Sequence, residues 1–371
     1  MPGGSIGVFV KSMAESLASS GIDVWVVGYG QKHKELVEQN NVKIKWLYLP
    51  YPLYMKVKVG GYRYSIADLI KRYFLSLEVN RLVRKNKIDI VESYDFSGPL
   101  AISPPCHFVV RLHGSVLAYR FAEGRPKQIS PVEKFFENQQ IRKANHIIAV
   151  SHHIGDLTNH VINQDLPFEV IYNGVDTVLF SPRANQSNDK SILFVGNLIW
   201  RKGILDLINA MPYIHQQQPD ATLLIAGGSS GEHEMRLNAA LNALDPAARK
   251  KIQLLGKIPH EQLPDLYNRA GVVVFPSRAE AFGLTCVEAM SCGRPIVSTS
   301  LASGPELITD GISGLIADPR NPEDLAQKIC LILDDPALAL KLGSAARKRA
   351  KEYFDMSVLT RKNIQFYHSI L

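Results

Sequence analysis

The sequence predicts an α/β protein made of two doubly wound, Rossmann-like domains. The first observation is length, because 371 residues exceed one ordinary core and suit two domains of roughly 150–200 residues. The second is that short apolar, β-branched runs alternate with longer amphipathic stretches, which predicts parallel sheets covered by helices on both faces. The third is a seam at Asn173-Gly174-Val175-Asp176, followed by the polar stretch 181–190.

The strand candidates are spread over both halves of the chain. In the first half they are Val24–Gly28, Ile44–Leu49, Ile88–Glu92, Phe108–Leu112, Ile147–Val150 and Glu169–Tyr172. In the second half they are Ser191–Gly196, Ala221–Ala226, Ile252–Leu255, Val272–Pro276, Pro295–Thr299 and Gly314–Ala317. Helical periodicity separates most of them, and Leu205, Ile208, Met211 and Ile214 form one clear stripe.

These elements predict an N-terminal domain over residues 1–173 and a C-terminal domain over residues 174–350. Ligands of such sheets bind beyond the carboxyl ends of the strands, so we expect a cleft where the two sets of ends face each other. The beginning is unusual, because Pro2-Gly3-Gly4 leads directly into a helix near residues 7–19. A strand normally precedes such a glycine turn, so we expect the first strand to be missing by truncation.

Composition excludes several classes of protein. Hydrophobic residues make up 46% and charged residues 21%, as in soluble globular proteins, and no apolar stretch approaches the roughly 20 residues that span a bilayer. No signal-peptide pattern appears at the N-terminus. The scattered cysteines predict reduced core thiols rather than a disulfide or zinc framework, and hence a cytoplasmic location; they are Cys106, Cys286, Cys292 and Cys330.

The net charge of +7 indicates anionic partners, such as phosphorylated small molecules, anionic lipid or nucleic acid. No nucleic-acid module pattern appears, so nucleic acid is not expected. Basic residues concentrate between Lys56 and Lys87, interleaved with Tyr and Leu. A helix here would be amphipathic and basic, which suits either an anionic membrane surface, such as the inner face of the plasma membrane, or an ordinary solvated face.

The stretch from Pro276 to Met290 carries the strongest chemical signal. A buried strand ends at Pro276, a short loop follows, and a helix begins near Gly283 and stops before Gly293. The free N–H groups and positive dipole end of that helix predict a diphosphate pocket. Glu280 precedes the helix and could reach sugar hydroxyls, while Glu288 within it could accept hydrogen bonds from a ribose diol. The alternative is that both are ordinary surface carboxylates.

A second candidate loop runs from Gly196 to Gly203, after the strand Leu193-Phe194-Val195. Arg201 and Lys202 stand at the start of the next helix, whose positive dipole end is unfavourable for cations. An anion between them and the helix resolves this conflict, so Lys202 is predicted to face a donor phosphate. In the first half, His113 ends a buried strand, where its imidazole could enter the cleft or serve only the core.

Together these segments resemble glycosyltransferase family 4, the large group of retaining enzymes with the GT-B fold. The resemblance covers nearly the whole chain and is strongest from Val195 to Ala317. It rests on motifs in order and at the expected spacing. They are Pro2-Gly3-Gly4, Asn173-Gly174-Val175-Asp176, Phe275-Pro276-Ser277, Glu280 with Glu288 as a Glu-x7-Glu pair, Ala289-Met290-Ser291-Cys292-Gly293-Arg294-Pro295 and Gly304-Pro305-Glu306.

The resemblance implies a role for each matching position. Glu288 binds the donor ribose and Glu280 contacts the transferred sugar. Lys202 neutralises the departing diphosphate, and His113 contacts the transferred sugar or lines the catalytic centre. The remaining implied donor contacts are Gly4, whose amide lies near the phosphate or acceptor, and the backbone amides of Ala281, Phe282, Gly283, Leu284 and Thr285.

Two further expectations concern the nucleotide. The family often has Gly-Arg-Leu where this chain has Gly196-Asn197-Leu198, so Asn197 replaces an arginine that clamps phosphate, and Arg201 is expected to substitute. Base recognition in this fold depends on backbone contacts, here expected around Ile258. The sequence does not determine the base or the sugar. For the acceptor, the basic stretch suggests a saccharide or lipid-linked molecule in polysaccharide or glycolipid synthesis.

The implied mechanism is retention without a protein nucleophile, in which the leaving diphosphate oxygen helps to deprotonate the acceptor hydroxyl. No Asp-x-Asp ends a cleft strand, so neither a catalytic metal nor a cofactor is expected. The resemblance also implies that the last helix, residues 351–371, packs back on the N-terminal domain. Two alternatives stay open: an inactive nucleotide-sugar-binding protein, and a nucleotide-sugar epimerase or phosphorylase on the same fold.

Overall fold

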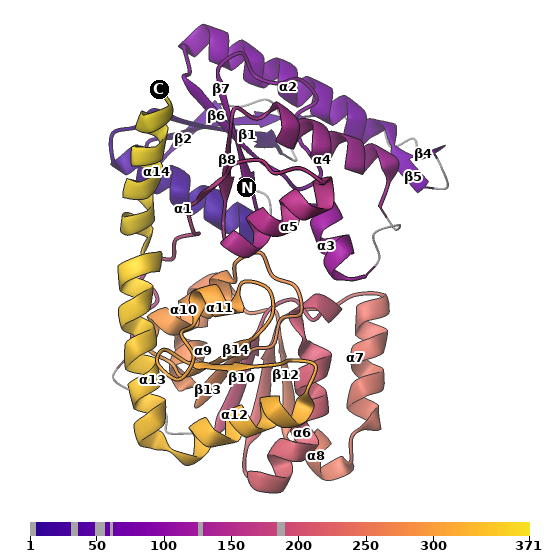
Figure 1. Ribbon diagram of the computed structural model, residues 1–371, viewed down its shortest axis with the longest axis vertical. Coiled ribbons are helices and arrows are strands. Elements are labelled where there is room, and N and C mark those ends of the chain that lie inside the picture. The colour runs from indigo at the N-terminus through magenta and orange to yellow at the C-terminus, as the bar shows by residue number, and fades with distance from the viewer. Residues whose placement is uncertain (1–4, 31–35, 49–55, 60–61, 125–128, 184–189) are drawn as a thin grey trace. The chain divides into compact units, whose positions relative to one another are not determined.

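The chain folds into two compact units in a computed structural model that describes residues 5–30, 36–48, 56–59, 62–124, 129–183 and 190–371 (Figure 1). The first unit comprises Met1–Gly174 and Met356–Leu371, and the second comprises Val175–Asp355. The first division falls within the seam read from the sequence. The second falls after Asp355, so residues 351–355 belong to the second unit and not to the last helix.

The second unit is a single parallel sheet of six strands in the order β12-β11-β10-β13-β14-β15. Its strands are β10 (Ser191–Val195), β11 (Thr222–Ala226), β12 (Ile252–Gly256), β13 (Val272–Phe275), β14 (Ile296–Thr299) and β15 (Leu315–Ala317). Its helices are α6 (Ile204–Gln217), α7 (Glu232–Ala243), α8 (Pro246–Lys250), α9 (Leu263–Arg269), α10 (Leu284–Ser291), α11 (Gly304–Leu307), α12 (Pro322–Asp334) and α13 (Pro336–Arg349). Short helical turns lie at Trp200–Lys202, His260–Gln262 and Ala350–Phe354.

The core of this unit explains why its elements are where the sequence predicts them. Every residue of β10 and β13 is buried, as central strands of a parallel sheet require. The apolar stripe of α6, including Ile208, Met211 and Ile214, packs against these strands within one apolar cluster. The apolar runs of this half therefore mark true strands to within one or two residues.

The first unit contains more elements than the sequence predicts. Its strands are β1 (Val24–Tyr29), β2 (Leu36–Gln39), β3 (Val42–Leu47), β4 (Lys56–Val59), β5 (Tyr62–Ser65), β6 (Ile90–Tyr94), β7 (His107–Leu112), β8 (His146–Ala149) and β9 (Glu169–Val170). Its helices are α1 (Ser5–Ser19), α2 (Ile66–Asn86), α3 (Val116–Ala122), α4 (Pro131–Lys143), α5 (His152–Ile162) and α14 (Met356–Ile370). Of these, β2, β4 and β5 were not predicted.

The predicted single sheet of this unit is divided in two within the described residues. Strands β6-β7-β8-β9 form one parallel sheet, and β1-β3-β2 form another, in which β2 runs antiparallel to β3. No described strand lies between β1 and β6 to hydrogen-bond to both. The α/β class of the prediction is confirmed, while the continuity of this sheet is not.

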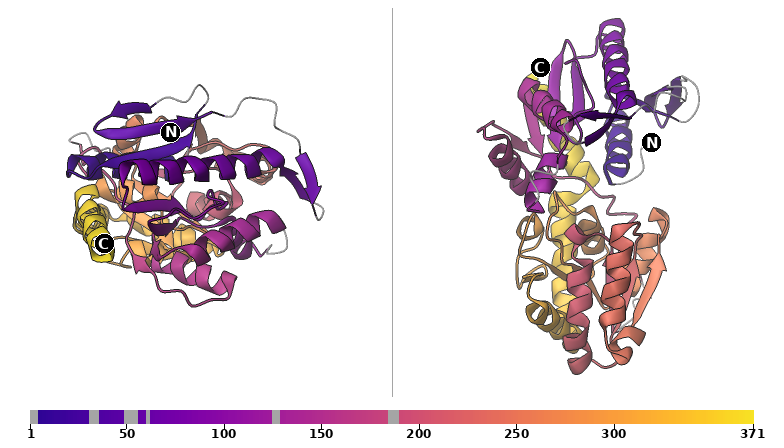
Figure 2. Two further views of the ribbon diagram at one scale, coloured as in Figure 1. Left: turned by 90° about the horizontal axis from the view of Figure 1, so that it is seen from above. Right: turned by 90° about the vertical axis from the view of Figure 1, so that its right-hand side faces the viewer.

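The predicted basic helix over Lys56–Lys87 is wrong in its first part. Strands β4 (Lys56–Val59) and β5 (Tyr62–Ser65) pair antiparallel, and only Ile66–Asn86 is helical (Figure 2). The alternation Lys56-Val57-Lys58-Val59 has a period of two residues, which favours a strand. Among the described residues, no helix combines the length and apolar character that crossing a bilayer requires.

The last helix, α14, packs within the first unit beside α1. Ser16 and Thr360 share a hydroxyl hydrogen bond of 2.7 Å between these helices. Phe366 and Tyr367 of α14 pack against the core around Val109. The last helix begins at Met356 rather than at the predicted residue 351, because Asp355 has an extended backbone and its carboxylate accepts a hydrogen bond of 2.6 Å from Thr177.

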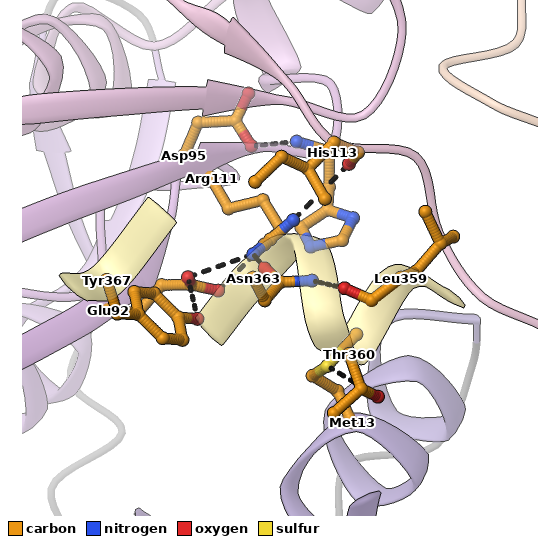
Figure 3. A network of polar contacts seen from close by, with 10 residues as sticks. Met13, Glu92, Asp95, Arg111, His113, Leu359, Thr360, Asn363 and Tyr367 are labelled. Atoms are coloured by element: carbon orange, nitrogen blue, oxygen red, sulfur yellow. Dashed lines mark hydrogen bonds and ion pairs between the residues drawn. The ribbon is translucent and has the colours of Figure 1, made fainter. Parts of the chain in front are cut away.

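A buried arginine joins α14 to the parallel sheet of the first unit (Figure 3). Arg111 of β7 donates from Nε and Nη2 to the two carboxylate oxygens of Glu92, at 2.7 and 3.0 Å. Its Nη2 also donates to Asn363 of α14, and Tyr367 donates to Glu92 at 2.8 Å. The guanidinium is only 1% exposed, so each of these acceptors offsets part of the cost of its burial.

Removing Glu92 should therefore destabilise the first unit strongly. We expect Glu92→Ala to lower the free energy of unfolding by about 3–5 kcal/mol, because the buried Arg111 charge loses its partner. Urea denaturation followed by circular dichroism measures this change. The matched control is Asp23→Ala, which breaks an exposed pair with Lys43 and should cost about 0–1 kcal/mol. Equal effects of the two substitutions would contradict the structural role of Arg111.

Candidate functional site

The site is built around the start of α10 in the second unit. Strand β13 ends at Phe275, and the loop 276–283 leads into the helix at Leu284. Gly283 precedes the helix at φ +106°, a left-handed conformation that favours glycine, and a Cβ there would lie 3.1 Å from Leu307. The first N–H groups of a helix have no acceptor within the helix, and no side chain caps this helix start. These N–H groups are therefore suited to bind an anion.

A small pocket opens at this helix start. Most of its polar lining comes from hydroxyl groups and from Glu280, and the lining includes Ser277, Gly283, Thr285, Thr299 and Ser303. The Ser303 hydroxyl donates a 2.7 Å hydrogen bond to the carbonyl of Phe282, which fixes the loop against the turn before α11. Of the predicted donor-binding residues, Glu280, Phe282, Gly283 and Thr285 line the pocket, whereas Lys202, Glu288 and Ile258 are not part of its lining.

The loop before α10 is tied to the loop that carries Lys202. The carbonyl of Arg201 accepts hydrogen bonds from the backbone N–H groups of Arg278 and Ala279, at 2.8 and 3.1 Å. At Gly203 the chains approach so closely that a Cβ would lie 1.8 Å from the carbonyl oxygen of Pro276, and φ is +70°. Only glycine fits this position, which explains why glycine follows Arg201 and Lys202 in the sequence.

This contact pairs the predicted phosphate lysine with the predicted sugar carboxylate. The ammonium of Lys202 forms an ion pair with Glu280, and both side chains are largely buried. Burial by itself raises the pKa of Glu280, but the charge and hydrogen bond of Lys202, the charge of Arg201 and the N–H of Ala281 together lower it below its ordinary value. Glu280 is therefore an anion at neutral pH.

Sequence reasoning missed a second ion pair that reinforces the same two loops. Arg278 donates to both carboxylate oxygens of Asp206 in α6, at 2.6 and 2.7 Å. Its guanidinium also lies over the ring of Trp200, 5.3 Å from the centroid. The sequence held a weak signal, since Asp206 lies in the first turn of the helix that Lys202 precedes.

Glu288 lies within α10 and already accepts two hydrogen bonds. The hydroxyl of Tyr267 donates to Oε2 at 2.9 Å, and Nε2 of His260 lies 3.0 Å from Oε1. The residue is only 5% exposed. Neither partner was foreseen, although His260 directly follows the segment 257–259 that was expected to contact the base.

The remaining predicted donor residues occupy varied positions. Asn197 is exposed in the loop after β10, and Arg201 is half-buried in the turn that holds Lys202. Ile258 is half-buried in the loop after β12, and Leu284 begins α10. Gly4 lies outside the described residues.

His113 lies in the first unit, directly after β7. Its ring meets the ring of Phe9 edge-on with centroids 5.1 Å apart. Its backbone N–H donates to Asp95 at 2.9 Å (Figure 3). Burial, with the charge of Arg111, lowers the pKa of His113 to about 3. The imidazole is therefore neutral at physiological pH and can donate or accept a hydrogen bond. Its contact with the transferred sugar stays a prediction.

No group of three or more His, Cys, Asp or Glu side chains stands close enough to hold a metal ion within the described part of the chain.

Comparison with known proteins gives the same pattern as the motifs. A family model described as Glycosyl transferases group 1 matches residues 177–349, and one described as Glycosyltransferase Family 4 matches residues 2–179. The chain is 30% identical to the glycogen synthase of Mycobacterium tuberculosis over 244 residues, which are 65% of this chain but only 57% of that enzyme. It is 27% identical over 310 residues to the D-inositol 3-phosphate glycosyltransferase of Corynebacterium efficiens, covering 79% of this chain and 69% of that protein.

Solved structures share the fold over nearly the whole chain. The sucrose-phosphate synthase of Thermosynechococcus elongatus matches with a TM-score of 0.80 at 21% identity, covering 99% of this chain and 94% of that one. The Anabaena protein HepE, solved in complex with UDP and glucose, matches with a TM-score of 0.77 at 18% identity, covering 99% and 96%. At these identities the likeness establishes the two-domain GT-B architecture.

The pairing of His260 with Glu288 predicts a pH-dependent stability. The hydrogen bond and charge of Glu288, with the charge of Glu261, raise the pKa of His260 above its ordinary 6.5. A group whose folded pKa is raised stabilises the fold fully below its unfolded pKa and loses this effect as pH rises through the folded value. The free energy of unfolding of the second unit should therefore contain a contribution that is larger at pH values below the ordinary histidine pKa of about 6.5 than at pH values well above it.

Urea denaturation of the parent and of His260→Gln at these pH values measures that contribution. The variant lacks the titrating imidazole, so its free energy of unfolding should fall less over the interval. The control is His233→Gln, at an exposed position on α7, which should keep the parent's dependence. If all three proteins change alike, His260 does not gain stability from Glu288.

Proposed function

The chain belongs to glycosyltransferase family 4, and we propose that it transfers a sugar from a nucleotide-diphosphate sugar to an acceptor hydroxyl, with retention of configuration. The observation that carries the proposal is the pairing of Lys202 with Glu280 beside the start of α10. A carboxylate and a helix amino terminus at one pocket, with a cation paired to that carboxylate, are the groups that a diphosphate joined to a hydroxylated sugar requires. The presence of UDP and glucose in the similar HepE structure supports this type of donor.

In this proposal the protein stabilises the charge that grows on the leaving diphosphate. The N–H groups from Gly283 to Thr285 bind the phosphate oxygens at the positive end of α10. Lys202 adds a full positive charge from the neighbouring loop. Because both loops are held by backbone hydrogen bonds, the donors are in place before the reaction and need little reorganisation.

Glu280 orients the transferred sugar in this scheme. Its carboxylate is anionic and lines the pocket, so its oxygens can accept hydrogen bonds from sugar hydroxyls. Its pairing with Lys202 makes it a weak nucleophile, which favours a route without a covalent intermediate. The acceptor hydroxyl then attacks on the face of the leaving diphosphate, whose oxygen takes the hydroxyl proton, and configuration is retained.

We also propose that the reaction proceeds without a catalytic metal, since Lys202, Arg201 and the helix amides supply positive charge where the diphosphate would lie. Glu288 is proposed to accept the ribose hydroxyls, and the loop around Ile258 to contact the base.

The acceptor is proposed to be a saccharide or lipid-linked molecule used at an anionic membrane surface. Helix α2 exposes an apolar stripe, in which Tyr73 is 50% and Phe74 is 52% exposed. Leu69 and Leu77 extend this stripe, and the exposed Arg84 and Lys85 follow in the last turns. Apolar side chains flanked by cations suit a helix lying at the boundary of anionic headgroups.

Substitution of Lys202 tests the proposed role in catalysis. We expect Lys202→Ala to lower the rate of nucleotide-sugar hydrolysis or transfer about 100- to 1,000-fold, because one preorganised charge donor is lost. The donor is first found by a thermal-shift screen of nucleoside diphosphates and their sugars, and turnover is then followed with labelled donor. The matched control, Lys250→Ala, removes an exposed lysine of α8 and should leave turnover unchanged. Failure of every nucleotide to shift the unfolding temperature would sink the proposal.

Liposome sedimentation tests the membrane surface separately. The parent should sediment with anionic vesicles at about 50 mM salt and much less at about 500 mM, because screening weakens the attraction of Arg84 and Lys85. Arg84→Glu/Lys85→Glu should abolish sedimentation, and Phe74→Ser should weaken it at both salt concentrations. The charge-matched control, Lys250→Glu/Lys341→Glu, lies in the second unit and should sediment like the parent. If both α2 variants sediment with anionic vesicles as the parent does, α2 is not the membrane-binding surface.

A further inference from the structure

The carboxylate of Glu288 is held from two directions by parts of the chain that flank α10. Nε2 of His260, in the turn 260–262, lies 3.0 Å from Oε1. The hydroxyl of Tyr267, in α9, donates to Oε2 at 2.9 Å. Tyr267 is fully buried and Glu288 is 5% exposed, so the carboxylate has little freedom to rotate.

The His260 ring is itself fixed by packing. It meets the buried ring of Phe180 edge-on, with centroids 5.2 Å apart, and Phe180 also packs against Tyr267 with centroids 6.1 Å apart. The side chain of His260 is 35% exposed, so one side of the imidazole remains open to solvent. Its charged neighbours are Glu288 and Glu261. The imidazole therefore connects a rigid interior to the loop that follows β12.

Each carboxylate oxygen has two lone-pair directions, and each oxygen of Glu288 uses one of them for its hydrogen bond with His260 or Tyr267. The remaining direction on each oxygen can accept one further hydroxyl. A vicinal diol offers two hydroxyl donors at a fixed separation, so it fits a carboxylate whose plane is already set. A freely rotating carboxylate would have to lose that freedom on binding.

We infer that His260 and Tyr267 are positioning residues that set the plane of the Glu288 carboxylate, so that the site selects donors with an intact ribose diol. This inference rests on the proposed function, in which Glu288 accepts the ribose hydroxyls. It assigns to His260 a role in selectivity for the nucleotide, separate from the phosphate contacts of Lys202 and the amides of α10.

The test compares two ligands that differ only in the diol. Isothermal titration gives the dissociation constants of the preferred nucleoside diphosphate, identified among UDP, GDP and ADP, and of its 2′,3′-dideoxy analogue. The parent should prefer the ribose form. In His260→Ala this preference should fall about 10- to 100-fold, the range for partners that orient a ligating group. Binding of the dideoxy form should not change, since it never reaches Glu288.

Further variants separate positioning from general damage. His260→Gln places an amide N–H near the position of Nε2 and should restore most of the preference for the ribose form. Tyr267→Phe keeps the aromatic ring but removes the hydroxyl donor, and it should reduce this preference. His233→Ala, an exposed histidine of α7, should behave like the parent. If the buried Tyr267→Phe variant fails to fold, the comparison of His260→Ala with His260→Gln still tests the inference.

The outcomes distinguish this inference from the function on which it rests. A parent that binds no nucleoside diphosphate overturns the proposed function itself. A parent that binds both ligands equally, or a His260→Ala variant that keeps the full preference, overturns the inference and leaves the diphosphate site intact. Equal weakening of both ligands in His260→Ala also overturns it, because the residue would then support the fold and not the diol.

Discussion

The candidate site depends on the close contact between two loops of the second unit. The carbonyl of Arg201 accepts two backbone N–H groups from the loop before α10, and Gly203 lies against the carbonyl of Pro276, where any side chain would collide. This contact brings Lys202 to Glu280 and holds both beside a helix amino terminus. If these loops were not joined, Lys202 and Glu280 would lose more conformational entropy when they came together.

Two cations of these loops are paired with carboxylates. The anionic Glu280 compensates Lys202, and Asp206 compensates Arg278. A diphosphate bound as proposed at the start of α10 would meet helix amides, with Lys202 already oriented beside Glu280. Lys202 can then share its charge between Glu280 and the ligand, which avoids leaving either carboxylate or ammonium buried alone.

Buried polar groups in the first unit serve structure as well as chemistry. Arg111 links β7 to α14 through Glu92 and Asn363, and its charge helps to keep the adjacent His113 neutral. The residue singled out for catalysis thus stands beside an ion pair that secures the last helix. The exposed face of α2, which is proposed to lie at a membrane surface, belongs to the same unit.

The sequence by itself determined the strands of the second unit, the α10 loop and the Lys-Gly turn, because buried parallel strands are apolar runs and glycine marks the positive φ values of Gly203 and Gly283. It also carried the family resemblance. The strands β2, β4 and β5 escaped it, since each has only four residues, too few for a clear periodic pattern. Only the tertiary structure decided that Lys202 pairs with Glu280, that Arg278 pairs with Asp206, and that His260 and Tyr267 hold Glu288. These partners lie between 21 and 78 positions apart, and side chains that distant meet only where packing of the sheet and its helices brings them together.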